Sequence, residues 1–165
     1  NAFYYPEYNN GWKVLAQPDG TLEFEGERFN YLFWEANVRD HLEEIHPQEG
    51  FIVAGKEAIS FLEEKLISVG FTSEERADFI TFWGPKLAAN EHNLVRFEWN
   101  ESCDKFADLS ISPQPDHLYR FYIFMSEVDG NYSLAPQILP KFSREGFVAL
   151  EWGGQISDYQ PKNSL

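Results

Sequence analysis

The chain has 165 residues, of which 43% are hydrophobic and 17% aromatic, and 13 Lys and Arg against 27 Asp and Glu give a formal net charge of -14. This length and composition predict one folded domain over 1–165 with an aromatic-rich core. The charge opposes nucleic acid and anionic membranes, and no apolar run is long enough to span a bilayer. We therefore expect no nucleic-acid partner and no membrane insertion.

The first 36 residues alternate short aromatic and β-branched runs with strong turn signals. Asn-Asn-Gly at 9–11 tolerates positive φ, and Gln-Pro-Asp-Gly at 17–20 is typical of a tight turn. The pattern predicts a meander of antiparallel strands.

Residues 1–2, Asn-Ala, match the remainder of a Ser-Asn-Ala tag-cleavage sequence, so we expect the natural chain to begin upstream.

Residues 37–50 are polar and charged, and we interpret them as a connection with at most one helical turn. His41 and His46 lie there among carboxylates, which are ligand types for a metal ion. Their spacing is wrong for a zinc protease helix, and the acids at 40–49 lack the regular spacing of a calcium loop. A solvated connector is the favoured interpretation, and metal binding by the two His remains an alternative.

Two helices are expected in the middle of the chain. Apolar residues at helical spacing predict one helix over about 56–69, with Gly70 positioned to end it. The second, over about 73–89, has Thr72 as a capping residue. Gly84 and Pro85 are expected to interrupt this second helix or kink it.

The remainder returns to strand-like sequence, and the final residues 156–165 are expected to form a peripheral tail. The predicted strands are 94–99, 107–112, 117–128 and 147–152. Strands, then two helices, then strands predict an α+β fold with a mainly antiparallel sheet and both helices packed on one of its faces.

The segments YPEYNNGWKV, PDGTL, YLFWEA, FLEEKL and EWGG, in this order and spacing, resemble an uncharacterised family of small bacterial proteins over roughly residues 4–154. Members of that family have a preceding strand-like segment rich in Ile, Tyr, Leu and Pro, which this chain lacks. The resemblance implies a single domain of unknown function. It brings no activity, cofactor or catalytic residue.

An acid stands beside a Trp in three places, and carboxylates flanked by aromatic rings are what glycoside hydrolysis needs. The pairs are Trp34 with Glu35, Glu98 with Trp99, and Glu151 with Trp152. Around Glu35 the strand carries rings on both faces, so we expect a central strand with this acid partly buried. The cleaner alternation around Glu98 and Glu151 predicts surface acids.

Arg120 falls on an apolar face of its strand, which makes it the expected partner of Glu35 because an unpaired buried charge costs several kcal/mol. Arg96 is the second possible partner. Glu35 with another carboxylate, as in a glycosidase-like hydrolase, is the catalytic alternative. If the protein has a ligand-binding surface instead, its candidate residues are Trp34, Trp99, Trp152 and Arg120. For the three Trp residues, however, core positions are favoured.

Cys103 is the single cysteine, so it forms no internal disulfide, and its acidic neighbours raise rather than lower a thiol pKa. No nucleophile motif and no glycine-rich phosphate loop are present, and no cofactor is expected.

The leading hypothesis is a non-catalytic binding or structural module for a protein or glycan at a bacterial surface, either secreted or in the cell envelope. It requires an exposed cluster of two or more aromatic rings. The sequence leaves the oligomeric state open.

Overall fold

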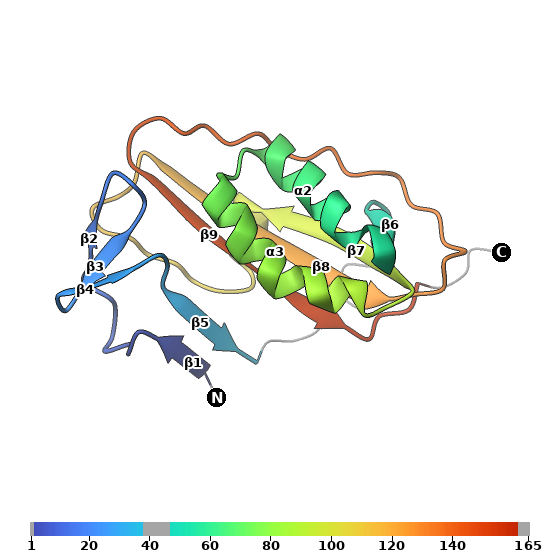
Figure 1. Cartoon of the computed structure of the whole chain (residues 1–165), viewed down its shortest axis with the longest axis horizontal. Helices are drawn as coiled ribbons and strands as arrows, with labels where there is room; N and C mark the ends of the chain where they lie inside the picture. Colours follow the sequence, from blue (N-terminus) through green and yellow to red (C-terminus); the bar gives the residue numbers. More distant parts are fainter. Residues whose placement is uncertain (1, 38–46, 162–165) are drawn as a thin grey trace. The chain divides into compact units, whose positions relative to one another are not determined.

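The computed structural model describes residues 2–37 and 47–161, and the chain divides into two compact units. We call Asn1–Arg39 the N-terminal unit and Asp40–Leu165 the C-terminal unit. Strands, helices and then strands follow each other along the chain (Figure 1), which confirms the α+β class. The expectation that 1–165 forms a single domain stays a prediction.

The N-terminal unit consists of two small antiparallel sheets. β1 (Ala2–Tyr5) pairs with β5 (Phe33–Ala36), and β2 (Leu15–Ala16), β3 (Leu22–Phe24) and β4 (Glu27–Phe29) form a three-stranded meander. No strand here exceeds four residues, and neither helix of the described chain belongs to this unit. The sheets therefore have no helical layer of their own against which to bury a face.

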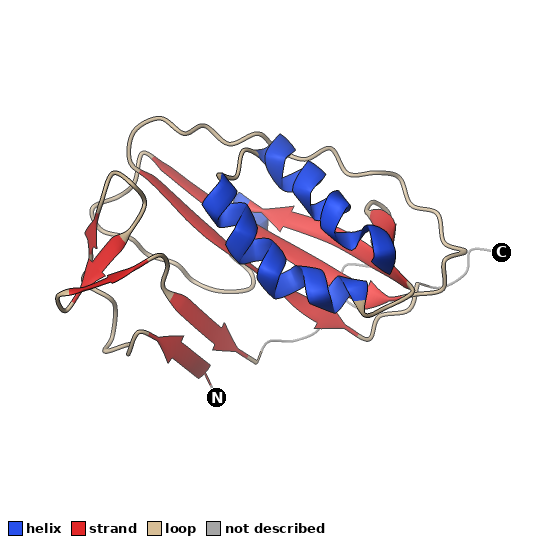
Figure 2. Cartoon of the chain, viewed as in Figure 1, coloured by secondary structure: helices blue, strands red, loops and turns tan. Residues whose placement is uncertain are grey.

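The C-terminal unit contains a four-stranded sheet in the order β6-β7-β8-β9 (Figure 2). Its strands are β6 (Phe51–Ala54), β7 (His92–Trp99), β8 (His117–Glu127) and β9 (Val148–Ser157). The first three pair antiparallel, whereas β8 and β9 pair parallel. A parallel pair cannot be joined by a tight hairpin, and a long crossover at 128–147 makes the connection.

Helices α2 (Ala58–Val69) and α3 (Ser73–Ala88) lie over one face of this sheet, as predicted (Figure 1). Two short 3₁₀ turns, η1 (Gly55–Glu57) and η2 (Asn100–Cys103), follow β6 and β7. Local sequence explains the helix ends. Gly70 ends α2 with a φ of 104°, and the Thr72 capping box opens α3.

Three expectations need correction. α3 continues through Pro85 to Ala88, so the expected interruption is wrong, and a kink stays a prediction; a proline near the C-terminal end removes few helical hydrogen bonds. Residues 107–112 form no strand: they are mostly exposed, and β7 and β9 already occupy both edges of β8. β9 extends to Ser157, two residues into the segment expected to be a tail.

The core of the C-terminal unit lies between the helices and the sheet. It is dominated by aromatic rings, with Phe97 and Phe121 stacked at 4.9 Å between centroids and Phe71 edge-on to Phe121 at 5.5 Å. Its fully buried side chains include Leu62, Leu66, Phe79, Leu87, Val95, Phe97, Phe121 and Ile123.

The crossover at 128–147 is attached to the rest of the unit at several points. The side-chain amide of Gln137 accepts from the Phe97 N–H and donates to the Phe97 carbonyl, both at 2.8 Å. Gln137 thus bonds to the edge of β7 just past the point where β6 begins. The Phe142 N–H donates to Val69, and Arg144 bonds to Glu75. The crossover is thus held along the edge of the sheet and at the helix turn.

Candidate functional site

The sheet face opposite the helices carries a buried ion network centred on Arg120. This side chain is 4% exposed, and its guanidinium donates to Glu151 at 2.6 Å, to Asp104 at 2.9 Å and to the Tyr122 hydroxyl at 3.1 Å. Burial disfavours the charged form, but the bond to Glu151 and its charge outweigh that and raise the pKa of Arg120. Each of the three guanidinium nitrogens has a partner within the network, so Arg120 serves to hold the structure together.

Glu98 and Glu151 are not the surface acids that alternation predicted. Glu98 is 7% exposed and accepts from Arg96 at 2.8 Å, while the Glu151 side chain is 13% exposed and bonds to Arg120. The alternation itself is correct, but the second face of the sheet is covered by η2 and the residues around Phe106. A polar position on a covered face must be paired, which is why each acid has an arginine.

The EWGG segment follows from the same packing. Glu151 pairs with Arg120, and Trp152 packs against Phe79 of α3 at 5.3 Å between centroids. A side chain at Gly153 would lie against the Tyr122 ring, and a Cβ at Gly154 would lie 2.0 Å from a backbone oxygen of β8. The motif is therefore explained by strand pairing and helix contact.

Glu35 is exposed on β5, in register with Phe3 of β1, which corrects the expectation of a partly buried acid on a central strand. β5 belongs to a two-stranded ribbon, so rings on both faces do not indicate a central position. Among the described residues none forms an ion pair with Glu35, and the predicted pairing with Arg120 or Arg96 is wrong, because those two pair with Glu151 and Glu98.

The three tryptophans proposed as ligand platforms are all partly buried. Trp99 and Trp152 pack against the helix-facing core, as the favoured interpretation expected. Trp34 is half-buried on β5 opposite Tyr4.

Cys103 is buried on the covered side of the sheet, and burial raises the pKa of its thiol to about 12. A thiol in this state is neither a nucleophile nor a metal ligand at neutral pH.

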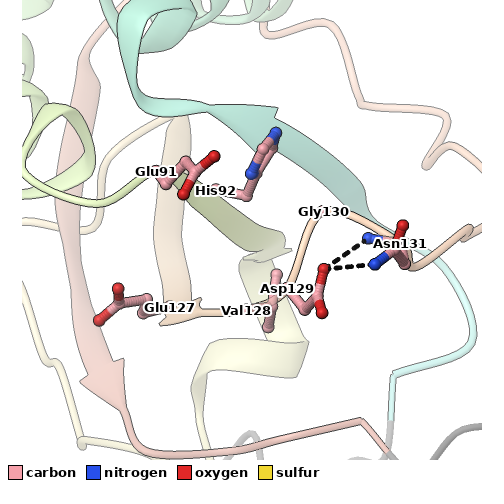
Figure 3. A pocket seen from close by; sticks show the side chains of 7 residues that line it. All are labelled: Glu91, His92, Glu127, Val128, Asp129, Gly130 and Asn131. Atoms are coloured by element: carbon pink, nitrogen blue, oxygen red, sulfur yellow. Dashed lines mark hydrogen bonds between the residues drawn. The ribbon is translucent and has the colours of Figure 1, made fainter.

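A pocket of about 450 Å³ lies where β7 begins and β8 ends (Figure 3). Its lining is acidic and contains no Phe, Tyr or Trp: Glu91, His92, Glu127, Val128, Asp129, Gly130 and Asn131. Asn131 donates twice to Asp129, and the His92 ring occupies the space beside Gly130. Within 2–37 and 47–161 no group of His, Cys, Asp and Glu has a geometry that would hold a metal ion.

His41 and His46, the sequence-based metal candidates, lie outside the described residues. No helix in the described segments combines the length and the apolar composition needed to cross a membrane.

The N-terminal unit presents a cluster of aromatic rings that the sequence interpretation missed. We call Tyr4, Tyr8 and Trp12 the ring cluster. Tyr4 and Tyr8 stack at 4.6 Å between centroids with an interplanar angle of 16°, and Trp12 is edge-on to Tyr8 at 4.8 Å. The Trp12 indole N–H donates to the carbonyl of Pro6 at 3.0 Å, which closes the loop between the rings.

These rings are exposed to solvent. Tyr4 is 39% exposed and Tyr8 41%, and neighbouring Phe3 and Tyr5 are each 58% exposed. Of the described residues of this unit, Pro6 alone is buried. The signal in the sequence is the density of rings in YYPEYNNGW, which predicts strands and a turn but does not by itself show that the rings gather at the surface.

Comparison with known proteins gives one short similarity. The chain is 47% identical over 34 residues, 19% of its length, to a protein of Butyrivibrio fibrisolvens described as "Uncharacterized protein in bglA 3'region", and it spans 35% of that relative. No model of a protein family and no solved structure matches. The similarity is thus to a protein without an assigned function.

Proposed function

We propose that this protein is a non-catalytic binding module that holds a neutral glycan against the ring cluster of its N-terminal unit. The observation that carries the proposal is the exposure of Tyr4 and Tyr8 in a cluster that is fixed by the Trp12 bond to Pro6. This meets the requirement for an exposed group of two or more rings.

The chemistry of the rings supports a sugar ligand. A pyranose has an apolar C–H face and a polar rim, and a Tyr ring likewise offers an apolar face with a hydroxyl at its edge. The Tyr4 and Tyr8 rings are held by stacking on each other and by Trp12, so binding would immobilise few additional rotamers.

The charge of the chain supports a neutral ligand over an anionic one. At a net charge of -14 the protein repels polyanions, and Glu7 stands within the ring-cluster loop. Carboxylates beside the rings would accept hydrogen bonds from sugar hydroxyls without opposing a neutral chain.

We include in this proposal that the motifs YPEYNNGW, PDGTL, YLFWE and EWGG define a family of small bacterial proteins that act outside the cell or in its envelope. Support comes from the role of the motifs: the first contains Tyr8 and Trp12 of the ring cluster, and the last contains the acid that pairs with Arg120. A glycan ligand is also consistent with such a location.

The test is affinity electrophoresis against soluble neutral glucans, xylans and galactans, followed by titration calorimetry on any polymer that retards the protein. We expect retardation by at least one polymer, with an affinity about tenfold weaker for Tyr8→Ala and nearly unchanged for Tyr8→Phe, which keeps the ring. Phe147→Ala removes a ring that is 37% exposed in the C-terminal unit and serves as the matched control. No retardation by any polymer, or equal loss in the control, would contradict the proposal.

A further inference from the structure

Glycine directly follows an Asn or an Asp at three places in the chain, namely Asn10–Gly11, Asp19–Gly20 and Asp129–Gly130. At such a pair the backbone nitrogen of the glycine can attack the side-chain carbonyl carbon of the residue before it, because glycine has no Cβ to obstruct the approach. An Asn amide is the more reactive target, since an ionised carboxylate repels the attack. The reaction requires that hydrogen bonds hold neither group.

The pair at Asp19 is held by such bonds. Its carboxylate accepts from the Thr21 N–H at 3.0 Å and from the Thr21 hydroxyl at 2.6 Å. The Gly20 N–H donates to the Gln17 carbonyl at 2.9 Å. Both the attacking nitrogen and the attacked side chain are therefore engaged elsewhere.

The pair at Asp129 is held in a similar way. Its carboxylate accepts from the Asn131 N–H at 3.3 Å and from the Asn131 side-chain amide at 2.7 Å. The His92 ring lies against Gly130, where an added Cβ would stand 2.8 Å from the imidazole. The side chain is bonded and the glycine is crowded.

The pair at Asn10 has neither restraint. Asn10 and Gly11 are both exposed, and within 2–37 and 47–161 no residue forms a hydrogen bond to the Asn10 side chain or to the Gly11 N–H. A Cβ added at Gly11 would meet nothing within 4 Å. No hydrogen bond has to break, and no neighbour has to move, before the Gly11 nitrogen turns toward the amide carbon.

We propose that Asn10 is a site of spontaneous modification, at which the chain loses ammonia and becomes a mixture of Asp and isoaspartate. The Gly11 nitrogen bonds to Cγ of Asn10, the Cγ–Nδ2 bond breaks, and the amide nitrogen leaves as ammonia with the proton that the Gly11 nitrogen gave up. Water then opens the cyclic imide. Opening at the side-chain carbonyl gives Asp, and opening at the backbone carbonyl gives isoaspartate. Water is the single co-reactant, and no electrons are transferred.

The modification falls within the loop of the ring cluster. Asn10 lies along the chain between Tyr8 and Trp12, whose rings are 4.8 Å apart. Both products add a negative charge to a loop that already carries Glu7. Isoaspartate also lengthens the main chain between the two rings by one methylene. The site therefore changes as the protein ages, and this inference goes beyond glycan binding and does not depend on it.

The first experiment stores the folded protein at neutral and at alkaline pH and follows it by isoelectric focusing and peptide mass mapping. We expect a species with one additional negative charge, with the exchange of NH₂ for OH located at Asn10. Alkaline pH should accelerate its formation, because the attacking nitrogen must lose its proton. Asn10→Gln should abolish the new species, since a Gln would have to close a larger ring. Asn9→Gln is the matched control and should leave the rate unchanged, because Asn9 is equally exposed but precedes Asn10 and not a glycine.

The second experiment separates the effect of the structure from that of the sequence. The rate at Asn10 is measured in the folded protein and in the urea-unfolded chain, with circular dichroism to check the state of each sample. We expect the two rates to agree within about tenfold, because a loop without restraining bonds opens at almost no cost in free energy. Enzymatic methylation of isoaspartate should label the peptide that contains Asn10 and leave those with Asp19 and Asp129 unlabelled.

Three results would overturn the proposal: an intact Asn10 in the folded protein while the unfolded chain is modified, an unchanged rate in Asn10→Gln, or equal labelling at Asp19 or Asp129. Each of them would leave the proposed glycan binding standing, since that is measured on freshly prepared protein.

Discussion

Both units of this chain are rich in aromatic residues, but they use them in opposite ways. In the C-terminal unit Phe79, Phe97 and Phe121 are fully buried between two helices and a four-stranded sheet. In the N-terminal unit Phe3 and Tyr5 are each 58% exposed. The difference lies in layering, because a ring is buried only where a second element covers its face. Aromatic content alone therefore does not distinguish a core from a binding surface.

The largest expected effect comes from removing one aromatic ring from each unit. Phe121→Ala should lower the free energy of unfolding by about 3–5 kcal/mol, because it leaves a cavity among stacked rings. Phe3→Ala should change it by no more than about 0.5 kcal/mol, since an exposed ring loses little on truncation. Urea unfolding followed by Trp fluorescence gives both values. Similar losses in the two variants would mean that Phe3 is as well packed as Phe121.

The next test separates a buried ion network from an exposed acid. Arg120→Met should cost about 3 kcal/mol, because Glu151 then keeps a buried charge without its partner. Adding Glu151→Leu should recover most of that loss. Glu35→Gln is the control from the N-terminal unit and should be nearly neutral, as its side chain is exposed. If the double variant is no more stable than Arg120→Met, charge burial does not explain the cost.

The smallest expected effect is a pH dependence of the free energy of unfolding, which arises from Cys103 in the C-terminal unit. In the unfolded chain the Cys103 thiol ionises near its ordinary pKa of about 8.5, whereas in the folded chain burial raises that pKa to about 12. Between these values the unfolded state binds fewer protons, so stability falls as pH rises. Urea unfolding at about pH 8 and about pH 10 should show a loss that is about 1–2 kcal/mol smaller in Cys103→Ala. An equal loss of unfolding free energy between these pH values in both proteins would refute the assignment of this pH dependence to Cys103.

Local signals in the sequence predicted the helices well. The apolar spacing of 56–69, the Gly70 stop and the Thr72 cap each depend on only a few neighbouring residues, and α2 and α3 confirm them. The interruption expected at Pro85 was wrong: α3 runs on to Ala88, and the close contact of Gly84 with Ile59 of α2 is a tertiary feature that no local pattern contains.

Local signals in the sequence could not predict which residues pair with the charged side chains. Arg120 is paired with Glu151 because β9 lies parallel to β8, and strand order is a long-range property that alternation does not encode. The same gap explains Glu35: rings on both faces of its strand suggested a central position, yet within the described residues of its unit β5 pairs with one strand, β1. The acid expected to be partly buried is exposed, whereas of the two acids expected at the surface Glu98 is buried and Glu151 is partly buried.

The parallel pairing of β8 and β9 also orders events during synthesis. Arg120 leaves the ribosome 31 residues before Glu151, and until that acid arrives the guanidinium cannot be desolvated without a large cost. Most of the residues that cover both faces of the sheet precede residue 148, whereas the surroundings of Arg120 stay incomplete until β9 adds to the edge. We therefore expect a nascent chain that ends before residue 148 to keep Arg120 hydrated even where the rest of the sheet has closed.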